Sequence, residues 1–140
     1  MKAYLDSSAI VKLVRTESGH EQMVEFAGDA DLLVSAAIAY PESRSAIARM
    51  FDRRPRELRA ARTELDAFWA RLAVLPIDEE RGRSAGDIAE AHRLRGMDAV
   101  HVAAALEMAS EVSPLIFASW DSDQRDAAVR EGLEVFPTRL

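Results

Sequence analysis

The sequence contains no cysteine. A disulfide framework, a zinc–thiolate site and a thiol nucleophile are therefore excluded. No uninterrupted apolar run approaches the roughly 18 residues that a membrane-spanning helix needs. No secretory leader is expected either, because Asp6 interrupts the start of the chain before an apolar segment can form. We therefore expect a cytoplasmic protein that does not enter a membrane.

Lysine is scarce, with Lys2 and Lys12 the only two, and the 24 acidic residues outnumber the 18 Lys and Arg to give a net charge of −6. This balance argues against a protein that holds nucleic acid by its overall charge. The segment 44–62 differs, since seven arginines against Asp52 and Glu57 give it a local charge of +5. Such a segment fits contact with RNA phosphates, docking of an acidic partner, or a solvated helical face with salt bridges.

The length of 140 residues fits one domain, predicted to span residues 1–140. The chain has no linker, repeat or low-complexity tract, and short apolar segments alternate with amphipathic stretches. Strands are expected at 3–5, 31–34, 115–118 and 133–136, with a poor, peripheral strand at 74–77. Helices are expected from 9 to 14, 19 to 26, 35 or 36 to 50, 56 to 73, 78 to 94, 97 to 109 and 123 to 131. This alternation predicts an α/β fold, a three-layer α/β/α sandwich around a mostly parallel sheet.

Acidic residues stand near the ends of the predicted strands, where ligands bind in open α/β sheets. Asp6 directly follows the first strand, and Asp121 follows the strand 115–118 by two residues. Glu42 lies in the first turns of the helix after the second strand, and Asp98 opens an apolar helix. Each has an ordinary alternative role, as a helix cap, an Asx turn or a solvated helix residue.

Taken together, the four carboxylates indicate a metal site. Asp98 lies on a helix that we expect to be buried, where a carboxylate needs a partner or a metal ion. No Lys or Arg has an obvious claim on all four groups, and clustered carboxylates repel one another. Mg²⁺ or Mn²⁺ resolves this repulsion, since hard divalent cations prefer carboxylate and water oxygens.

Four segments of the sequence resemble one known family. The most specific is LRGMDAVHVAAA at residues 94–105, and YLDSSA at 4–9 matches the same family's opening motif. Residues 35–46 and 117–121, with 127–135 after them, match its second acidic motif and its closing motif. The sequence thus resembles the PIN-domain proteins, specifically the VapC-type toxin ribonucleases of bacterial toxin–antitoxin pairs, over nearly the whole chain.

The resemblance implies a PIN-like fold and an acidic quartet around Mg²⁺, for which Mn²⁺ can substitute, formed by Asp6, Glu42, Asp98 and Asp121. It places secondary groups near the site at Ser7, Ser119 and Asp123. The implied activity is metal-dependent endoribonuclease cleavage of RNA by water, which leaves 5′-phosphate and 3′-hydroxyl ends. The implied partners are a VapB-like, DNA-binding antitoxin and a second copy of the chain in a homodimer.

Other classes were weighed against this one. A phosphorylation receiver needs a lysine after a late strand, and none follows Lys12; a phosphatase with an Asp-x-Asp pair needs an acid at Ser8. A catalytically silent PIN-like scaffold that acts only by binding a partner stays open. We expect His101 to support the core or the site rather than act as a base, and Trp120 either to stack on a base or to be buried beside the site.

Overall fold

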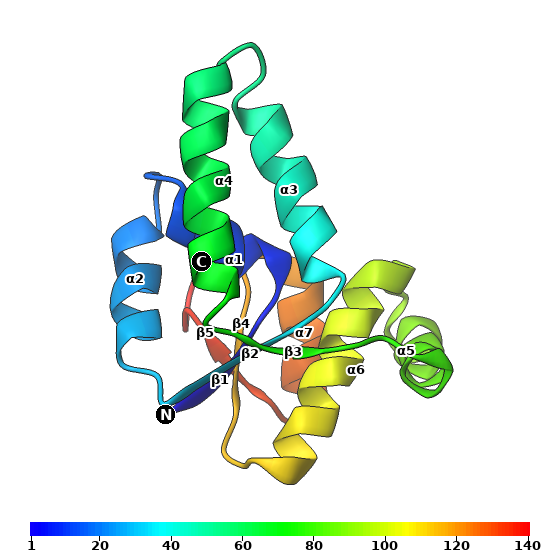
Figure 1. Cartoon of the computed structure of the whole chain (residues 1–140). Coiled ribbons are helices and arrows are strands. Elements are labelled where there is room, and N and C mark those ends of the chain that lie inside the picture. The colour runs from blue at the N-terminus through cyan, green and yellow to red at the C-terminus, as the bar shows by residue number, and fades with distance from the viewer.

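The computed structural model describes residues 1–140, and its centre is a wholly parallel five-stranded sheet (Figure 1). The strand order is β3-β2-β1-β4-β5, so the chain starts at the central strand, builds outward through β2 and β3, and then crosses back to add β4 and β5. The strands are β1 (Lys2–Leu5), β2 (Leu32–Ala36), β3 (Ala73–Leu75), β4 (Ile116–Ala118) and β5 (Glu134–Phe136).

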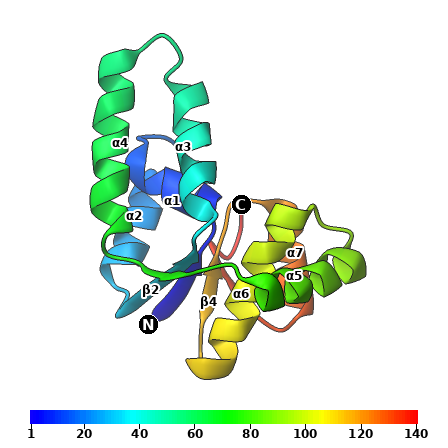
Figure 2. The same cartoon turned by 45° about the vertical axis from the view of Figure 1, so that its right-hand side comes forward.

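Seven helices cover the two faces of the sheet, which confirms the predicted three-layer α/β/α sandwich. One face carries α1 (Ser7–Val14), α2 (His20–Gly28), α3 (Ala39–Met50) and α4 (Pro55–Trp69). The other carries α5 (Glu79–His92), α6 (Gly96–Glu111) and α7 (Ser122–Arg130). Figures 1 and 2 show these two groups on opposite sides of the strands. No helix is both long and apolar enough to cross a membrane.

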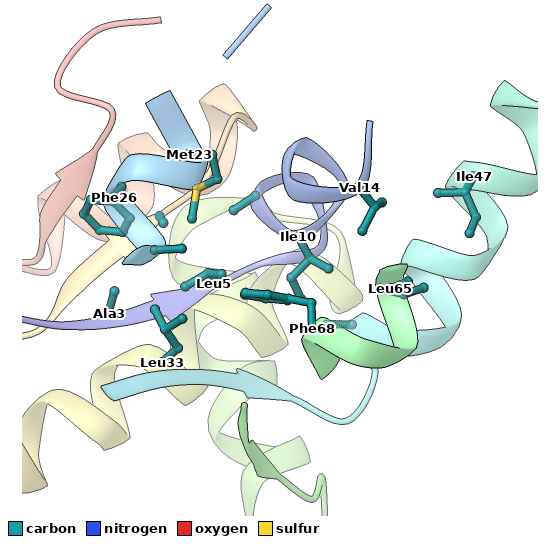
Figure 3. Close-up of a cluster of buried hydrophobic side chains, with 14 of the residues drawn as sticks. Ala3, Leu5, Ile10, Val14, Met23, Phe26, Leu33, Ile47, Leu65 and Phe68 are labelled. Carbon is teal, nitrogen blue, oxygen red and sulfur yellow. The ribbon is translucent and has the colours of Figure 1, made fainter. Parts of the chain in front are cut away.

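Side chains alternate between the two faces along each strand, as a pleated sheet requires. Ala3 and Leu5 of β1 pack in the cluster beneath α1, α2 and α4, where Figure 3 shows them with Ile10, Met23 and Phe26. Tyr4, between them in the sequence, belongs to the cluster on the opposite face. Both clusters therefore share the same central strand.

The helices α3 and α4 form a hairpin that projects beyond the rest of the molecule (Figures 1 and 2). Its base is anchored by Ile47 and Leu65, which are fully buried. At its turn Arg53 has a φ of 60°, in the left-handed region that non-glycine residues rarely adopt. The arginine-rich segment 44–62 thus occupies the upper part of α3, this turn and half of α4.

The second strand is longer than the sequence pattern predicts, and the helix after it begins later. Ser35 and Ala36 pair in parallel with Val74 and Leu75 of β3, and the Ser35 hydroxyl donates to the Leu5 carbonyl at 2.7 Å. These bonds keep the chain extended to Ala36, so α3 begins at Ala39. The peripheral strand predicted at 74–77 is present at the edge of the sheet, but it spans Ala73–Leu75 and ends before Pro76.

The packing of the hairpin on the domain can be tested at Leu65. We expect Leu65→Ala to lower the free energy of unfolding by about 2–5 kcal/mol, because truncating a fully buried leucine loses apolar burial and leaves a cavity. Urea denaturation followed by circular dichroism measures the change. The matched control is Val24→Ala in α2, where the side chain is exposed and the change should stay within about 0.5 kcal/mol. Equal losses in the two variants would contradict this packing.

Candidate active site

The candidate site lies where β1 and β4 run side by side and the chain turns to opposite sides of the sheet. Leu5 pairs with Ala118, so the residues that follow, Asp6 and Ser119, are neighbours at the carboxyl edge. In open α/β sheets this switch in strand order opens the crevice in which ligands bind. The topology therefore brings the first and last acidic motifs together, although they lie over a hundred residues apart.

Asp6 is fully buried and its carboxylate accepts three hydrogen bonds. The backbone N–H of Ala9 donates at 2.9 Å and so caps α1, while the hydroxyls of Ser8 and Ser119 donate at 2.7 and 2.6 Å. Burial raises the pKa of Asp6, and the nearby His101 ring and these hydrogen bonds oppose the rise. The side chain joins the end of β1, the start of α1 and the loop after β4.

Asp121 is connected to Asp6 through one hydroxyl. Its backbone N–H donates to Ser119 Oγ at 3.0 Å, and that same hydroxyl donates to Asp6. The Asp121 carboxylate accepts from the backbone N–H of Gln124 at 2.9 Å and caps α7. Asp121 is therefore a helix cap, one of the alternative roles expected from the sequence. The same hydrogen bond fixes its carboxylate at the edge of the sheet.

Asp98 lies half-buried in the first turn of α6, where its Oδ1 accepts a hydrogen bond from Gln124 Nε2 at 3.0 Å. Burial raises the pKa of Asp98, and the negative charges of Asp121 and Glu42 raise it further. The start of α6 is more exposed than expected, since Met97 is 46% exposed; the apolar middle of the helix is buried as predicted.

Glu42 is held by a buried chain of side chains. Its Oε1 lies 2.6 Å from His101 Nε2, and His101 Nδ1 lies 2.8 Å from the Tyr4 hydroxyl. Burial, followed by the charges of Asp6 and Glu42, holds the pKa of Tyr4 well above its usual range. The phenol stays protonated, so its O–H can donate to Nδ1 while Nε2–H donates to Glu42. His101 thus supports Glu42, as the sequence suggested, and is fully buried.

Two residues of the site were not predicted. Ser8, rather than its neighbour Ser7, holds the Asp6 carboxylate, and its Oγ also accepts the Trp120 N–H at 2.8 Å. Gln124 joins Asp98 to Asp121, and its Oε1 is buried without a hydrogen-bond partner. The sequence does contain a signal for Gln124. It stands three residues after the helix-capping Asp121, a spacing that is typical of the start of a helix.

The secondary residues predicted from the sequence fall in different places. Ser119 lies within the network, and Ser7 is half-buried beside a surface groove without a side-chain hydrogen bond. Asp123 is exposed and borders a separate hollow together with His92 and Arg93. The structure therefore brings Ser119 to the carboxylates and leaves Asp123 outside their hydrogen-bond network.

Trp120 is partly buried at the edge of the same groove. The Lys12 ammonium lies 5.7 Å from the centre of its ring, in a cation–π arrangement. On its other side the ring approaches Gly19, whose φ of 91° favours glycine and where an added Cβ would lie 3.0 Å from the indole nitrogen. Close packing therefore fixes the ring beside the site while part of it stays exposed.

Comparison with known proteins places the fold. The family model described as "PIN domain" matches residues 3–130. The chain belongs to the PIN-domain family.

Two curated PIN-domain relatives come from Mycobacterium tuberculosis and are named Ribonuclease VapC45 (strain CDC 1551 / Oshkosh) and Ribonuclease VapC49 (strain ATCC 25618 / H37Rv). Each is 36% identical over 140 residues, covering 98% of this chain and 96% of the relative. The VapC-type resemblance is thereby confirmed over nearly the full length.

Solved PIN-domain structures share the fold at lower identity. VapC20 of M. tuberculosis, described as a "Sarcin-Ricin loop cleaving toxin", superposes with a TM-score of 0.72 at 15% identity, covering 90% of this chain and 95% of that one. DNA-bound VapBC from Salmonella typhimurium gives 0.64 at 16% identity and covers 96% of both chains.

The carboxylates of this PIN domain lack cationic partners. No Lys or Arg forms an ion pair with Asp6, Glu42, Asp98 or Asp121, and Glu42 contacts only the His101 ring. No three His, Asp or Glu side chains are gathered closely enough to hold a metal ion together. The donor chemistry nevertheless fits a hard divalent cation, because the groups supply only oxygen and because burial, together with the charges of Asp121 and Glu42, raises the pKa of Asp98.

A groove of about 660 Å³ opens beside the quartet between α1 and α3, and we refer to it as the α1–α3 groove. Glu42 lines it together with Lys12, Arg49, Met97 and Trp120. A second hollow of about 560 Å³ lies between α5 and α6 and contains none of the quartet. The α1–α3 groove is therefore the approach to the acidic site of the PIN domain.

The repulsion at the site can be measured with Asp98→Asn. A carboxylate whose pKa is raised by folding makes the fold less stable once it ionises, so this cost appears as the pH rises above about 4. We expect the variant to melt about 1–3 °C higher than wild type at pH 7–8 in a metal-free buffer, since a half-buried group contributes under 1 kcal/mol.

The difference in melting temperature between Asp98→Asn and wild type should disappear as the pH falls towards 4. Differential scanning calorimetry between pH 4 and pH 8 measures it. The control is Asp87→Asn, at an exposed position of α5. A variant Asp98→Asn that melts below wild type at pH 8 without metal would contradict the assigned repulsion.

Proposed function

We propose that this PIN domain is a metal-dependent endoribonuclease, the toxin of a toxin–antitoxin pair. The observation that carries the proposal is the group of carboxylates at the switch point, where Asp98, Asp121 and Glu42 interact without any Lys or Arg to balance them. The names of the 36% identical relatives support ribonuclease activity. The expected ion is Mg²⁺, with Mn²⁺ as a substitute.

Asp6, Glu42, Asp98 and Asp121 are the residues that would hold the ion. When bound, such an ion lowers the pKa of a coordinated water and stabilises charge on the phosphate and the leaving oxygen. The residues of the chain prepare this site: Ser8 and Ser119 fix the Asp6 carboxylate, His101 fixes Glu42, and Gln124 fixes Asp98. Few side chains then need to be ordered when the ion and the substrate arrive.

The proposed reaction is hydrolysis at phosphorus. Water adds to the scissile phosphate and the bond to the 3′ oxygen breaks, with one proton passing from the water to a base and another reaching the departing 3′ oxygen. We assign to Asp98 or Asp121 the role of orienting the water or accepting its proton, and the raised pKa of Asp98 supports this role. The products are a 5′-phosphate and a 3′-hydroxyl, and the ribose 2′-hydroxyl takes no part.

Metal removal and product analysis test this chemistry. Cleavage of total RNA should vanish in EDTA, return with Mg²⁺ or Mn²⁺, and give fragments that a 5′-phosphate-dependent exonuclease degrades. A 2′-deoxy substitution at the cut nucleotide should leave the cleavage rate within about tenfold, because the 2′-hydroxyl is not the nucleophile. A 2′,3′-cyclic phosphate product, or full activity in EDTA, would show that the carboxylates are structural.

The quartet is tested with Asp6→Asn and Asp98→Asn. Both changes conserve volume and remove a negative ligand, so we expect at least a 100-fold loss of cleavage and of growth inhibition while the circular dichroism spectrum stays native. Asp87→Asn on α5 serves as the matched control. Full activity of Asp98→Asn would overturn the site. Absence of cleavage by wild type, together with binding of an antitoxin, would favour the silent scaffold instead.

The proposed protein partner is a small VapB-like antitoxin with a DNA-binding part. A VapBC complex is among the structures that share this fold, and an acidic pocket suits an inserted arginine, which can bridge carboxylates through two hydrogen bonds. A homodimer is proposed from the family resemblance, and sedimentation at micromolar concentration tests it: a monomer only would refute it.

The charge of the chain predicts how it behaves on DNA. With a net charge of −6, the isolated protein should not retard its operator DNA at micromolar concentration, whereas the complex with the antitoxin should. An electrophoretic mobility shift with and without the co-purified antitoxin measures this. Tight operator binding by the isolated chain would contradict the division of roles.

A further inference from the structure

The arginines of segment 44–62 outnumber the two acidic residues of the segment and form no ion pairs. None of the seven takes part in an ion pair, although the rest of the chain forms seven. Three guanidinium groups donate hydrogen bonds to uncharged groups, and four make neither a side-chain hydrogen bond nor an ion pair: Arg53, Arg56, Arg59 and Arg62. One of the three roles that the sequence left open for this segment, a solvated helical face with salt bridges, is therefore not what the structure shows.

These four residues lie in the turn of the α3–α4 hairpin and in the first half of α4, and we call them the arginine tip. Arg53 is in the turn, and Arg56, Arg59 and Arg62 follow at intervals of three along α4. This spacing moves each side chain about 4.5 Å along the axis and about 60° around it, so all three lie within one side of the helix. All four side chains are exposed, and the hairpin that carries them projects beyond the rest of the molecule (Figures 1 and 2).

The backbone of Arg53 has a conformation that is unusual for a residue with a side chain. Its φ of 60° is a conformation that glycine adopts easily and that other residues adopt with strain. A side chain held in a strained backbone conformation is a reason to look for its function. Here the side chain adds a fourth positive charge to the tip.

One arginine of the segment, Arg49, lines the groove beside the candidate active site. Glu42 and Arg49 are both on α3 and both line the α1–α3 groove; seven residues separate them, two helical turns or about 10 Å. Met97 and Trp120 form the apolar part of the same groove, where unpaired bases can stack or pack. A strand that enters the acidic site along this groove is directed past Arg49 towards the arginine tip.

The surroundings of the tip favour a phosphate backbone over a protein partner. Protein interfaces depend on apolar and aromatic anchors at their centre. The large exposed hydrophobic residues of this chain all lie outside the hairpin, at Met1, Val24, Val74, Met97, Val129 and Leu140. Guanidinium groups without such anchors suit phosphates, which they bind by charge and hydrogen bonds.

We propose that the arginine tip binds the sugar–phosphate backbone of the RNA strand whose scissile phosphate lies at the acidic quartet. The proposal rests on the proposed ribonuclease function and gives it a second contact region, in the turn and on the helix that follow the helix carrying Glu42. The arginine tip would then supply most of the electrostatic affinity for RNA, although the net charge of the whole chain is −6. The tip would then bind RNA of any sequence, while the groove and the quartet select the bond that is cut.

The test measures binding and cleavage separately. Binding uses the Asp98→Asn protein and a fluorescent single-stranded RNA 20-mer, with anisotropy recorded from 50 to 300 mM salt. In this background the triple variant Arg56→Gln/Arg59→Gln/Arg62→Gln should raise Kd at least about tenfold at 100 mM salt. It should also reduce the slope of log K against log salt by about 2, because each phosphate contact to a single strand contributes about 0.7.

Two controls separate charge from structure. Arg83→Gln/Arg93→Gln/Arg130→Gln removes three exposed charges on α5, after α5 and on α7, and should change Kd less than twofold. Replacing the three tip arginines by lysine keeps the charge and should keep the salt slope. Arg53→Gly should weaken RNA binding while the melting temperature stays equal or rises, because glycine adopts this backbone conformation without strain. If Arg53 had only a structural role, RNA binding would stay the same and the melting temperature would fall.

Each outcome bears on one proposal. Equal Kd and equal salt slope for the two triple variants would overturn the arginine tip as an RNA surface, whether or not wild type cleaves RNA. Loss of antitoxin binding in the tip variant with unchanged RNA binding would overturn it too, in favour of a protein partner. If wild type fails to cleave any RNA with Mg²⁺, the ribonuclease function fails, and the binding measurement then reports on the tip alone.

Discussion

The buried carboxylate of Asp6 is the interaction on which the arrangement of the site depends. It is the first residue after the central strand, it caps α1 through the Ala9 N–H, and it accepts the Ser119 hydroxyl from the loop after β4. A buried carboxylate is costly unless its oxygens are hydrogen-bonded, so these donors must stay in place for the fold to hold. The contacts that satisfy the buried Asp6 carboxylate are therefore also the contacts that hold the carboxyl ends of β1 and β4 together at the site.

The central strand serves both faces of the sheet, and this links the two halves of the quartet. Tyr4 points to the face opposite α1 and reaches His101, which in turn contacts Glu42. Two residues later, Asp6 begins the second network, which continues through Ser119 and Asp121 to the distant α6. One short strand thus sets the relative position of groups carried by α3, α6 and α7. Small displacements of β1, whose residues Ala3–Leu5 are fully buried, would therefore disturb every carboxylate at once.

The sequence predicted the order of strands and helices, the layered fold and the strand-end acids, because periodicity and turn residues are local signals. It did not predict which hydroxyl reaches Asp6, since Ser7 and Ser8 are adjacent and only the start of α1 decides which one faces the carboxylate. Gln124 was missed because its partner Asp98 lies on another helix. The end of β2 was predicted too early for a similar reason. Pairing with β3 keeps Ser35 extended, and this contact between distant residues cannot be inferred from local helix propensity.

The two edges of the sheet restrict how this protein can associate with others. Both outer strands, β3 and β5, are three residues long, and each is followed by a proline, Pro76 or Pro137, which offers no backbone N–H. Edge strands that are short and end in this way give a foreign strand little backbone to pair with. Extension of the sheet from one molecule into the next is therefore blocked at both ends. Any partner must be recognised through the side chains of helices and loops, so changes of partner can evolve by surface substitution without altering the sheet.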